Sequence, residues 1–528
     1  MLRRIACGLS LLFVSTGTAS ALPAYGPFQV SGNVQSQTLL RHPDIDTFKF
    51  IQNRNTLRLR LDYRMIDKGK LAGYLDLPWL AAGNLYVLYR GVYDSAYDIA
   101  PGGNLYDILR QPTGSLDDLS ADTGRGRKYE NDLREAYVDL EFRDVPLILR
   151  LGKQQIVWGE TDSFRMLDRA NPLDLTWHQV YESWDDLRLP LWMVKGLWHF
   201  GQVGPLSDAF VEAYWNPGDW RPAKQGFMPD NPWGIPASNP LAAFPNGLYK
   251  GRLFIQGDYH RTPGDNSQVG VRFSAVAPGG VQFTLNYFYQ RWAGDDGTNY
   301  APTRAILDPT EATDALLRGQ APLEFIAPYV HTAGFSLNYS EEEYTQAVFR
   351  LETVYDFGVP FTDTAKPSPI LPGLLWGVTK RDMWKGMIAF DRPTWIRSLN
   401  RTSTFFITGQ FFWHYLLDRE PTFIGNVDPS IPSRDNIRHW EAICTLLVST
   451  IYAGGSIVPT VQYGLDPVNS FNMYAGWTLD YFLTNRIIIR VGQNYFLAAA
   501  GAPAFESWSI GGLNRGRSES LVRLTYQF

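Results

Sequence analysis

The chain has 528 residues, a formal net charge of −5 and 19% charged residues. This mild negative charge excludes the strongly basic surface that nucleic-acid-binding proteins use, so we expect no nucleic-acid partner. Aromatic residues make up 14% of the chain, whereas the mean hydropathy is −0.20. Abundant aromatic residues with a negative hydropathy are typical of outer-membrane barrels, whose strands alternate apolar and polar positions.

Residues 1–21 have the pattern of a secretory signal peptide. Arg3 and Arg4 precede the short apolar run Ile5–Val14, and Ala19-Ser20-Ala21 is a small-residue cleavage site. Removal of this peptide takes away two arginines and changes the formal charge from −5 to −7. It also leaves Cys444 as the single cysteine, which excludes an intramolecular disulfide. We predict one mature domain over residues 22–528.

Alternating apolar and polar residues predict about eighteen strands, with sixteen as the alternative count. The pattern is sharp in the second strand, where Leu57, Leu59 and Leu61 alternate with Arg58 and Arg60. Such rows predict one face toward lipid and one toward a lumen. The predicted strands cover residues 28–38, 54–65, 84–94, 133–143, 147–157, 193–202, 209–215, 268–276, 281–291, 331–339, 344–356, 384–390, 402–416, 438–451, 456–465, 471–483, 486–496 and 518–528.

The connections between these strands alternate between short and long. Long connections are expected at residues 95–132, 158–192, 216–267, 292–330, 358–383, 417–437 and 497–517. Outer-membrane barrels have short periplasmic turns and long external loops, and the sorting places both termini on the short-turn side. One stretch, 442–465, lacks charges and resembles a membrane helix, but Gly454-Gly455 and Pro459 favour two strands joined by a turn.

The connection near residues 158–192 is unusually long, aromatic and charged. We predict an inward-folded, partly helical segment, with one helix from Thr161 to Asn171-Pro172 and another from Asp174 to Leu187. Mixed charges and tryptophans there can narrow a pore and sort solutes, tie the segment to the wall, or do both. The candidate lumen and constriction residues in and beside the segment are Lys153, Gln154, Trp158, Glu160, Asp162, Arg165, Asp168 and Arg169, and those on the wall are Arg58, Arg60, Arg350 and Glu352.

No cofactor, metal site or catalytic residue is predicted. The seven histidines lack zinc-site spacing, and the chain has neither a G-x-S-x-G motif nor a glycine-rich phosphate loop. An outer-membrane enzyme acting on lipid is kept as an alternative, because His199 or His331 would serve if a serine and an asparagine lay beside it. A non-conducting scaffold of an envelope export complex is the other alternative.

The last strand ends in an apolar row of Val522, Leu524, Tyr526 and the terminal Phe528. This row resembles the signal by which outer-membrane barrels are recognised, so we expect the barrel-assembly machinery and outer-membrane lipid as partners. The predicted location is the outer membrane of a Gram-negative bacterium.

Two motifs, Gly152-Lys153-Gln154-Gln155-Ile156-Val157-Trp158-Gly159-Glu160 and Asn171-Pro172-Leu173-Asp174, resemble a proteobacterial outer-membrane family known only as domain of unknown function thirteen-oh-two. The resemblance implies a barrel that is often encoded beside RND-type exporters and a lipoprotein-carrier-like partner. It supplies no catalytic residues. We therefore expect a porin-like channel or transport protein for small, hydrophobic or amphiphilic compounds, with an RND-type exporter as the partner that the resemblance implies.

Overall fold

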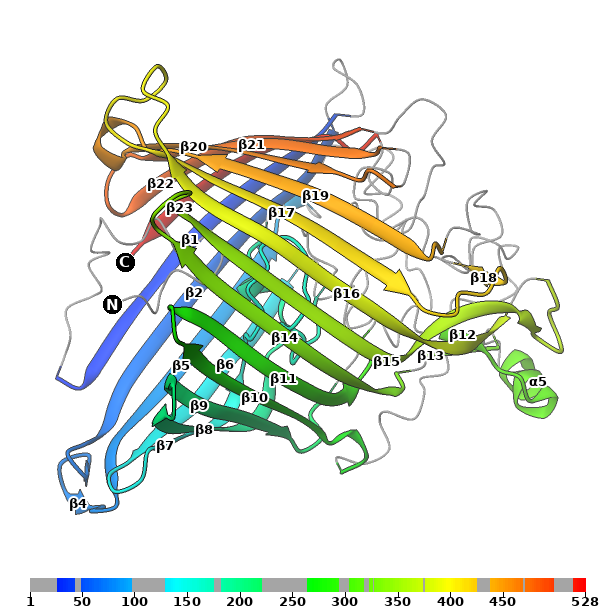
Figure 1. The fold of residues 1–528 in the computed structure, drawn as a ribbon, viewed down its shortest axis with the longest axis horizontal. Coiled ribbons are helices and arrows are strands. Elements are labelled where there is room, and N and C mark those ends of the chain that lie inside the picture. The colour runs from blue at the N-terminus through cyan, green and yellow to red at the C-terminus, as the bar shows by residue number, and fades with distance from the viewer. Residues whose placement is uncertain are drawn as a thin grey trace.

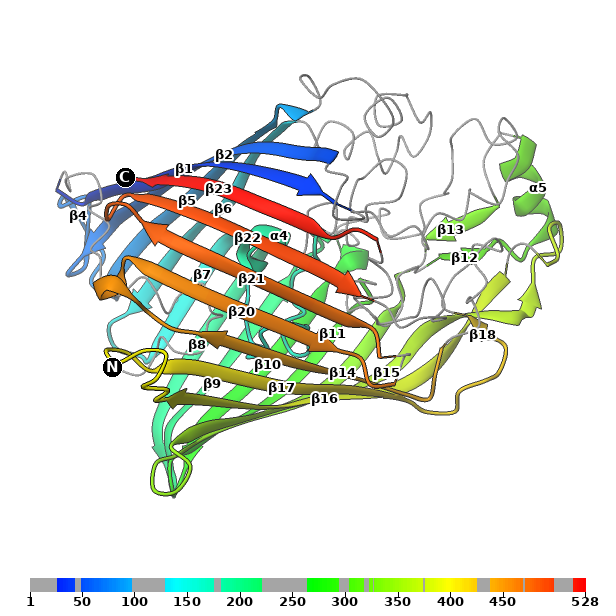
Figure 2. The same ribbon diagram turned by 90° about the horizontal axis from the view of Figure 1, so that it is seen from above.

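Eighteen strands, each antiparallel to its neighbours, form a closed β-barrel in the computed structural model (Figures 1 and 2). The predicted strand number is confirmed. The predicted signal peptide lies outside the described residues. The structure describes residues 26–42, 49–96, 129–174, 182–220, 264–293, 303–317, 322–325, 327–373, 376–424, 437–468, 471–497 and 516–528.

The barrel strands follow one another around the ring in chain order. They are β1 (Phe28–Arg41), β2 (Lys49–Asp67), β5 (Leu80–Asp94), β6 (Tyr129–Phe142), β7 (Leu147–Gln154), β8 (Leu191–Val203), β9 (Leu206–Asn216), β10 (Gln268–Ala277), β11 (Val281–Arg291), β14 (Tyr329–Glu341), β15 (Ala347–Pro367), β16 (Trp376–Thr394), β17 (Phe405–Leu416), β19 (Trp440–Ser449), β20 (Ile457–Leu465), β21 (Met473–Phe482), β22 (Ile487–Leu497) and β23 (Glu519–Gln527).

Short elements lie in the connections. The strand pairs are β3 (Lys70–Leu71) with β4 (Leu75–Asp76), and β12 (Thr303–Ala305) with β13 (Leu323–Phe325), while β18 (Phe423–Ile424) pairs with β15. In the part of the chain that the structure describes, the helices are α4 (Trp184–Leu187) and α5 (Pro309–Leu317), with 3-10 turns η3 (Gly264–Asn266) and η4 (Ala453–Gly455). Within the described ranges, no helix is both long and apolar enough to cross a membrane.

The ring closes between the first and last strands. β1 pairs with β2 on one side and with β23 on the other, with Asn33 opposite Gln527. Phe528 extends this pairing, since its amide donates to the Gly32 carbonyl at 3.0 Å and Gly32 donates back at 2.9 Å. A Cβ on Gly32 would lie 2.3 Å from the Arg58 carbonyl oxygen, so glycine permits this close approach. Closure leaves no unpaired edge, which is the condition for strands in lipid.

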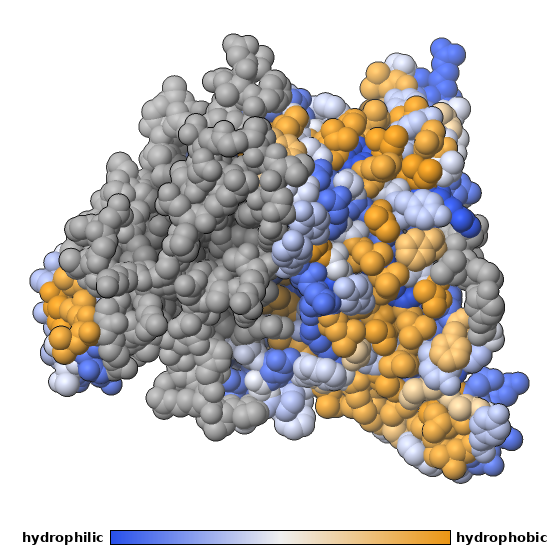
Figure 3. All heavy atoms as spheres, turned by 180° about the vertical axis from the view of Figure 1, so that it is seen from behind, coloured by the Kyte–Doolittle hydropathy of each residue, from blue (hydrophilic) through white to orange (hydrophobic). Residues whose placement is uncertain are grey.

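The two faces of the wall have opposite chemistry. Large apolar side chains are exposed on the outside of consecutive strands, for example Val461 (55%), Ile388 (52%) and Leu285 (52%), and Figure 3 shows apolar residues gathered over the outer wall. The alternate positions carry polar or charged groups, such as Gln462 in β20 and Glu352 in β15. The terminal row faces outward as well, with Val522 52%, Leu524 50% and Tyr526 42% exposed.

One predicted loop is wrong. Residues 358–383 were expected to form a long connection, but β15 continues to Pro367 and β16 begins at Trp376, so most of this stretch is strand. A β-bulge between Asp356 and Val359, with Gly358 at φ +75°, shifts the alternation by which the strand was recognised. The charge-free stretch 442–465 forms two strands joined at η4, as predicted. Of the other predicted long connections, 95–132, 216–267, 417–437 and 497–517 lie largely outside the described residues.

The alternation of faces makes a direct prediction about lipid. We expect Val461→Lys, on the outer face of β20, to lower the free energy of unfolding by about 2–4 kcal/mol, because it places a cation in the apolar belt. The adjacent Gln462→Lys faces inward and should cost about 1 kcal/mol, the value of its hydrogen bond to the Tyr474 hydroxyl. Urea unfolding of both variants in lipid vesicles measures the difference, and equal losses would contradict the assignment of faces.

Candidate functional site

The candidate site is built around the connection between β7 and β8, residues 155–190, which we call the β7–β8 segment. Its ends lie together, because Gln154 and Leu191 are register partners. The buried side chain of Asn171 joins its two arms: Oδ1 accepts from the Ile156 amide at 2.8 Å, and Nδ2 donates to the Leu189 carbonyl at 2.9 Å. The Asn171-Pro172 motif therefore closes a fold-back of the chain.

The segment has less helix than predicted. Residues 161–171 form bends, so the helix predicted from Thr161 to Asn171 is wrong. Of the helix predicted from Asp174 to Leu187, the described part contains only α4, which Ser183 caps by accepting from the Asp186 amide at 3.3 Å. One physical reason is that the backbone amide of Leu167, which the predicted helix would use internally, donates to Glu352 of the barrel wall instead.

Glu352 of β15 receives these amides. Its side chain is fully buried, and its two carboxylate oxygens accept from the amides of Glu160 (2.8 Å) and Leu167 (2.6 Å). Arg350, two residues earlier on the same face, donates to the Glu160 carbonyl and to the Asp162 carboxylate at 2.8 Å. Asp162 also accepts from Gln410 of β17 at 2.8 Å. Alternate residues of one strand thus hold the first arm of the segment, and we call these contacts the β15 anchor.

A second buried carboxylate of β15, Asp356, lies between two cations. It pairs with Arg169 of the segment and with Lys385 of β16, whose Nζ is 2.8 Å away. Both cations lie over the ring of Trp292, at 5.7 and 5.4 Å from the centroid. Thr332 of β14 adds a hydroxyl that donates to Asp356 at 2.6 Å. This group therefore joins the segment to β14, β15 and β16.

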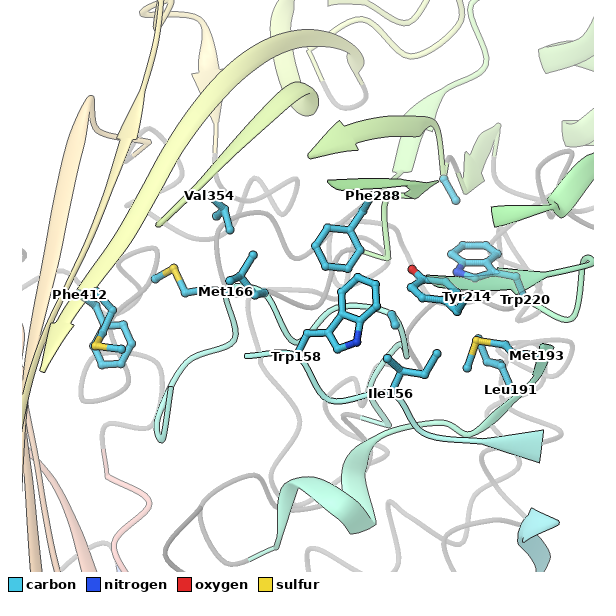
Figure 4. Packing of buried hydrophobic residues seen from close by; sticks show 14 of the residues in the cluster. Ile156, Trp158, Met166, Leu191, Met193, Tyr214, Trp220, Phe288, Val354 and Phe412 are labelled. Carbon is cyan, nitrogen blue, oxygen red and sulfur yellow. The ribbon is translucent and has the colours of Figure 1, made fainter. Parts of the chain in front are cut away.

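Apolar side chains fill the space between these anchors (Figure 4). Trp158, Met166 and Leu167 of the segment are at most 2% exposed, and they pack with Phe288, Val354 and Phe412, which project inward from β11, β15 and β17. Leu167 rests on Gly334, where an added Cβ would lie 2.2 Å from the leucine. The inner wall on this side therefore carries apolar side chains between its charged ones, whereas the inner face of a water-filled barrel is polar.

Trp158 also carries a polar contact. Its indole Nε1 donates to Glu212 of β9 at 2.9 Å. Glu212 in turn pairs with Lys195 of β8 at 3.3 Å and with Arg272 of β10 at 2.9 Å. Both ends of the tryptophan are therefore fixed, the ring by packing and the nitrogen by a charged acceptor.

The other arm ends in three carboxylates, Glu182, Asp185 and Asp186, which we call the acidic tip. Two of them face an arginine wall formed by Arg54, Arg58, Arg90, Arg134 and Arg523. These arginines come from the consecutive strands β2, β5 and β6 and from β23, which β1 separates from β2. Arg58 binds Asp186 through two parallel hydrogen bonds, 3.1 and 2.8 Å long. Arg90 reaches the same carboxylate at 3.3 Å.

Other contacts complete the attachment of the tip. Glu182 pairs with Arg54 and accepts from Gln37 of β1 at 3.1 Å. Arg134 donates to the carbonyls of Asp185 and Asp186 at 3.0 and 3.1 Å. Backbone and side-chain acceptors of the tip therefore both bind arginine.

The two attachment points lie on opposite sides of the ring. β2, which carries Arg58, and β15, which carries Arg350, are nine positions apart in the closed order of eighteen barrel strands. Trp184 connects the arms, because its indole donates to the Asp162 carbonyl at 3.0 Å. Figure 2 draws α4 within the outline of the barrel. The contacts of this one segment thus run from one wall to the wall opposite.

The carboxylates of the two arms differ in acidity. Burial raises the pKa of Glu160 and Asp162, and it outweighs the hydrogen bond from Asn338 to Glu160 and the charge of Arg350 beside Asp162. Burial acts on Asp186 as well, but Arg58, Arg90 and Arg134 outweigh it and hold the pKa of Asp186 well below its usual range. A depressed pKa means that the stabilisation from the tip is present at neutral pH and is lost only in strong acid.

The remaining predicted residues have structural contacts. Lys153 binds Asp132 at 3.0 Å, and buried Gln154 donates to the Met193 carbonyl at 2.9 Å. Arg165 donates to the Asp168 and Asn171 carbonyls, and Asp168 accepts from Arg188 at 2.7 Å. Arg60 lies apart from this group, binding Asp62 at 2.6 Å with half of its side chain exposed. Among the described residues, no three His, Cys, Asp or Glu side chains are placed to hold a metal.

Several residues of the site were missed from sequence. Asp356 continues the row of Arg350 and Glu352, so the alternation would have found it. Arg134 lies at a bulge of β6, where the register with β5 shifts, and periodicity cannot assign its face. Lys385 and Glu212 become relevant only through partners distant in sequence, and no local pattern marks them.

The fold assigns the protein to the all-β class, as a closed barrel of eighteen antiparallel strands. The chain belongs to the family described as "Protein of unknown function (DUF1302)", whose model matches residues 66–450. No curated protein matches the sequence.

Three of the solved structures that are similar to this chain have low sequence identity to it. Salmonella typhi OmpF in complex with daunomycin is 9% identical, with a TM-score of 0.38 over 95% of this chain and 97% of that one. Pseudomonas aeruginosa OccK8 (OprE) is 9% identical, with a TM-score of 0.43 over 95% and 98%. Acinetobacter baumannii OccAB3 is 9% identical, with a TM-score of 0.44 over 95% and 99%.

The shared carboxylate of Asp356 gives a test of the attachment. We expect Asp356→Ala to lower the free energy of unfolding by about 3–5 kcal/mol, because it removes the counter-charge of two buried cations. Asp62→Ala is the matched control: it breaks an exposed ion pair with Arg60 and should cost about 0–1 kcal/mol. Urea unfolding in micelles compares the two, and similar losses would show that Asp356 has no special role.

Proposed function

We propose that the protein is an outer-membrane channel whose conducting path is narrowed by the β7–β8 segment. The observation that carries this proposal is that the segment contacts strands on opposite sides of the ring, Arg58 in β2 and Arg350 in β15. Material passing along the barrel axis has to go around the segment or displace it. A constriction that is lined by fixed charges selects solutes by size and by charge.

The outer surface supports a location in lipid. Closed barrels satisfy every backbone group internally, and the exposed apolar side chains of consecutive strands match a hydrocarbon environment. The predicted signal peptide and terminal phenylalanine fit export and assembly in the outer membrane of a Gram-negative cell. The contact with the barrel-assembly machinery, through Val522, Leu524, Tyr526 and Phe528, belongs to the same proposal.

The family resemblance and the mixed chemistry of the lumen support a small, hydrophobic or amphiphilic substrate. Trp158, Phe288 and Phe412 form a buried apolar cluster on one side of the lumen, and the arginine wall places charge on the other. The candidate residues in the segment combine two roles in this proposal, since the ion pairs that attach the segment also set the charge of the constriction. A partner of the RND exporter type is part of the proposal and rests on the family resemblance alone.

Replacement of residues 155–190 by Asn-Gly tests the channel. Gln154 and Leu191 are register partners, so a two-residue turn can join them without disturbing β7 and β8. In planar bilayers we expect small conductance steps from the wild type and steps several times larger from the deletion. Heat-modifiable migration in gels and protease resistance would verify that the deleted protein forms a barrel.

Other results would reject this proposal. Folded wild type and folded deletion variant that both fail to conduct would favour a scaffold. Hydrolysis of phospholipids by the purified wild type, without conductance, would favour the lipid-acting enzyme.

A further inference from the structure

The acidic tip and the arginine wall differ in the secondary structure that supports them. The five arginines of the wall project from strands, and the side chains of Arg54, Arg90 and Arg134 are at most 5% exposed. The tip is attached to a helix of only four residues, α4. A change that separates the two surfaces would therefore move the tip and leave the wall in place.

Departure of the tip alone is unfavourable. Asp186 supplies the carboxylate that Arg58 and Arg90 share, and Glu182 supplies the one at Arg54. Without these groups the wall would hold buried guanidinium groups whose charge is less well compensated, and uncompensated buried charge is strongly destabilising. Opening at this wall therefore requires another anion to replace the carboxylates. Guanidinium groups bind carboxylate and phosphate with the same two-pronged geometry that Arg58 shows toward Asp186.

The surroundings of the tip indicate the rest of such a ligand. Leu187 and the partly buried Trp184 pack with Leu173 and with Val92, an inward residue of β5 next to Arg90 in the same row. An apolar group thus accompanies the carboxylates of the tip to the wall. A ligand that reproduces both features has an anionic group joined to an apolar body.

We propose that the arginine wall is a binding site for the carboxylate or phosphate group of an amphiphilic anion, and that the acidic tip is a built-in competitor for this site. This inference rests on the proposed channel function, because it names the substrate class and the step that opens the constriction. Binding of the anion releases the tip, and loss of the anion lets the tip return. The ligand shifts the equilibrium only by as much as it binds the wall better than the tip does.

Hydrogen exchange of the full-length protein in nanodiscs tests this step. Octanoate is the probe, and octanamide is its neutral control of the same size and chain length. We expect octanoate to increase amide exchange in peptides covering residues 182–190, and octanamide to leave it unchanged. Octyl phosphate tests the phosphate arm in the same way: a larger effect than that of octanoate would identify phosphate as the preferred group. Equal effects of octanoate and octanamide, or no effect of either anion, would overturn the proposal.

Variants of the two surfaces should change octanoate affinity in opposite directions. The double variant Glu182→Gln, Asp186→Asn weakens the competitor, so we expect about tenfold tighter binding by calorimetry in nanodiscs, with empty nanodiscs subtracted. Arg58→Gln is compared in the background of that double variant, where the competitor is already weakened; there it removes a binding group and should weaken binding about tenfold. Glu420→Gln is the control, since it removes a carboxylate from an exposed pair with Arg381 and should leave affinity unchanged. Equal changes of octanoate affinity in all three variants would overturn the proposed anion site.

The results separate this inference from the channel itself. Release of the tip by octanoate in a protein that never conducts would support the anion site and reject the channel. Conductance that grows on deletion of the segment, without any release of the tip by octanoate or octyl phosphate, would support the channel and overturn the anion site.

Discussion

Compensation of buried carboxylates inside a closed barrel is the interaction on which the structure of the β7–β8 segment depends. Glu352 and Asp356 of β15 are fully buried, and each is compensated by groups of the segment: backbone amides for Glu352, and Arg169 for Asp356. A buried carboxylate without such partners would be strongly destabilising. The wall therefore determines the path of the segment, which bonds outward to the strands instead of forming the helices that its sequence favours.

The two arms of the segment are attached by different physical means. The first arm combines the β15 anchor with a large apolar contact around Trp158, Met166 and Leu167, so its attachment does not depend on charge alone. The acidic tip depends mainly on carboxylates facing arginines, with a smaller apolar contact around Leu187. An anion competes with the second kind of attachment and hardly with the first. This asymmetry is why we place the opening step at the arginine wall and the permanent attachment at β15.

The segment finds partners on opposite sides of the barrel because the ring is closed and its strands follow one another in chain order. β7 and β8 are neighbours, yet the chain between them reaches β2 on one side and β15 on the other, nine ring positions apart. A connection that left the barrel mouth would meet neither strand from the inside. The same closure pairs Phe528 with Gly32 and removes the edges that lipid cannot tolerate. The closed wall and the position of the segment thus follow from one topological property.

The sequence by itself determined the barrel, its eighteen strands and the inward rows of Arg58, Arg350 and Glu352, because a period of two is a local property of each strand. It also identified the β7–β8 segment by its length and composition. It failed where a bulge breaks the period, at Arg134 and beyond Asp356, and where helix signals such as Thr161 compete with the wall for backbone amides. Only the tertiary structure decided that Asp186 meets Arg58 and that Lys385 shares Asp356 with Arg169, because these partners are far apart in sequence and come together only when the ring closes.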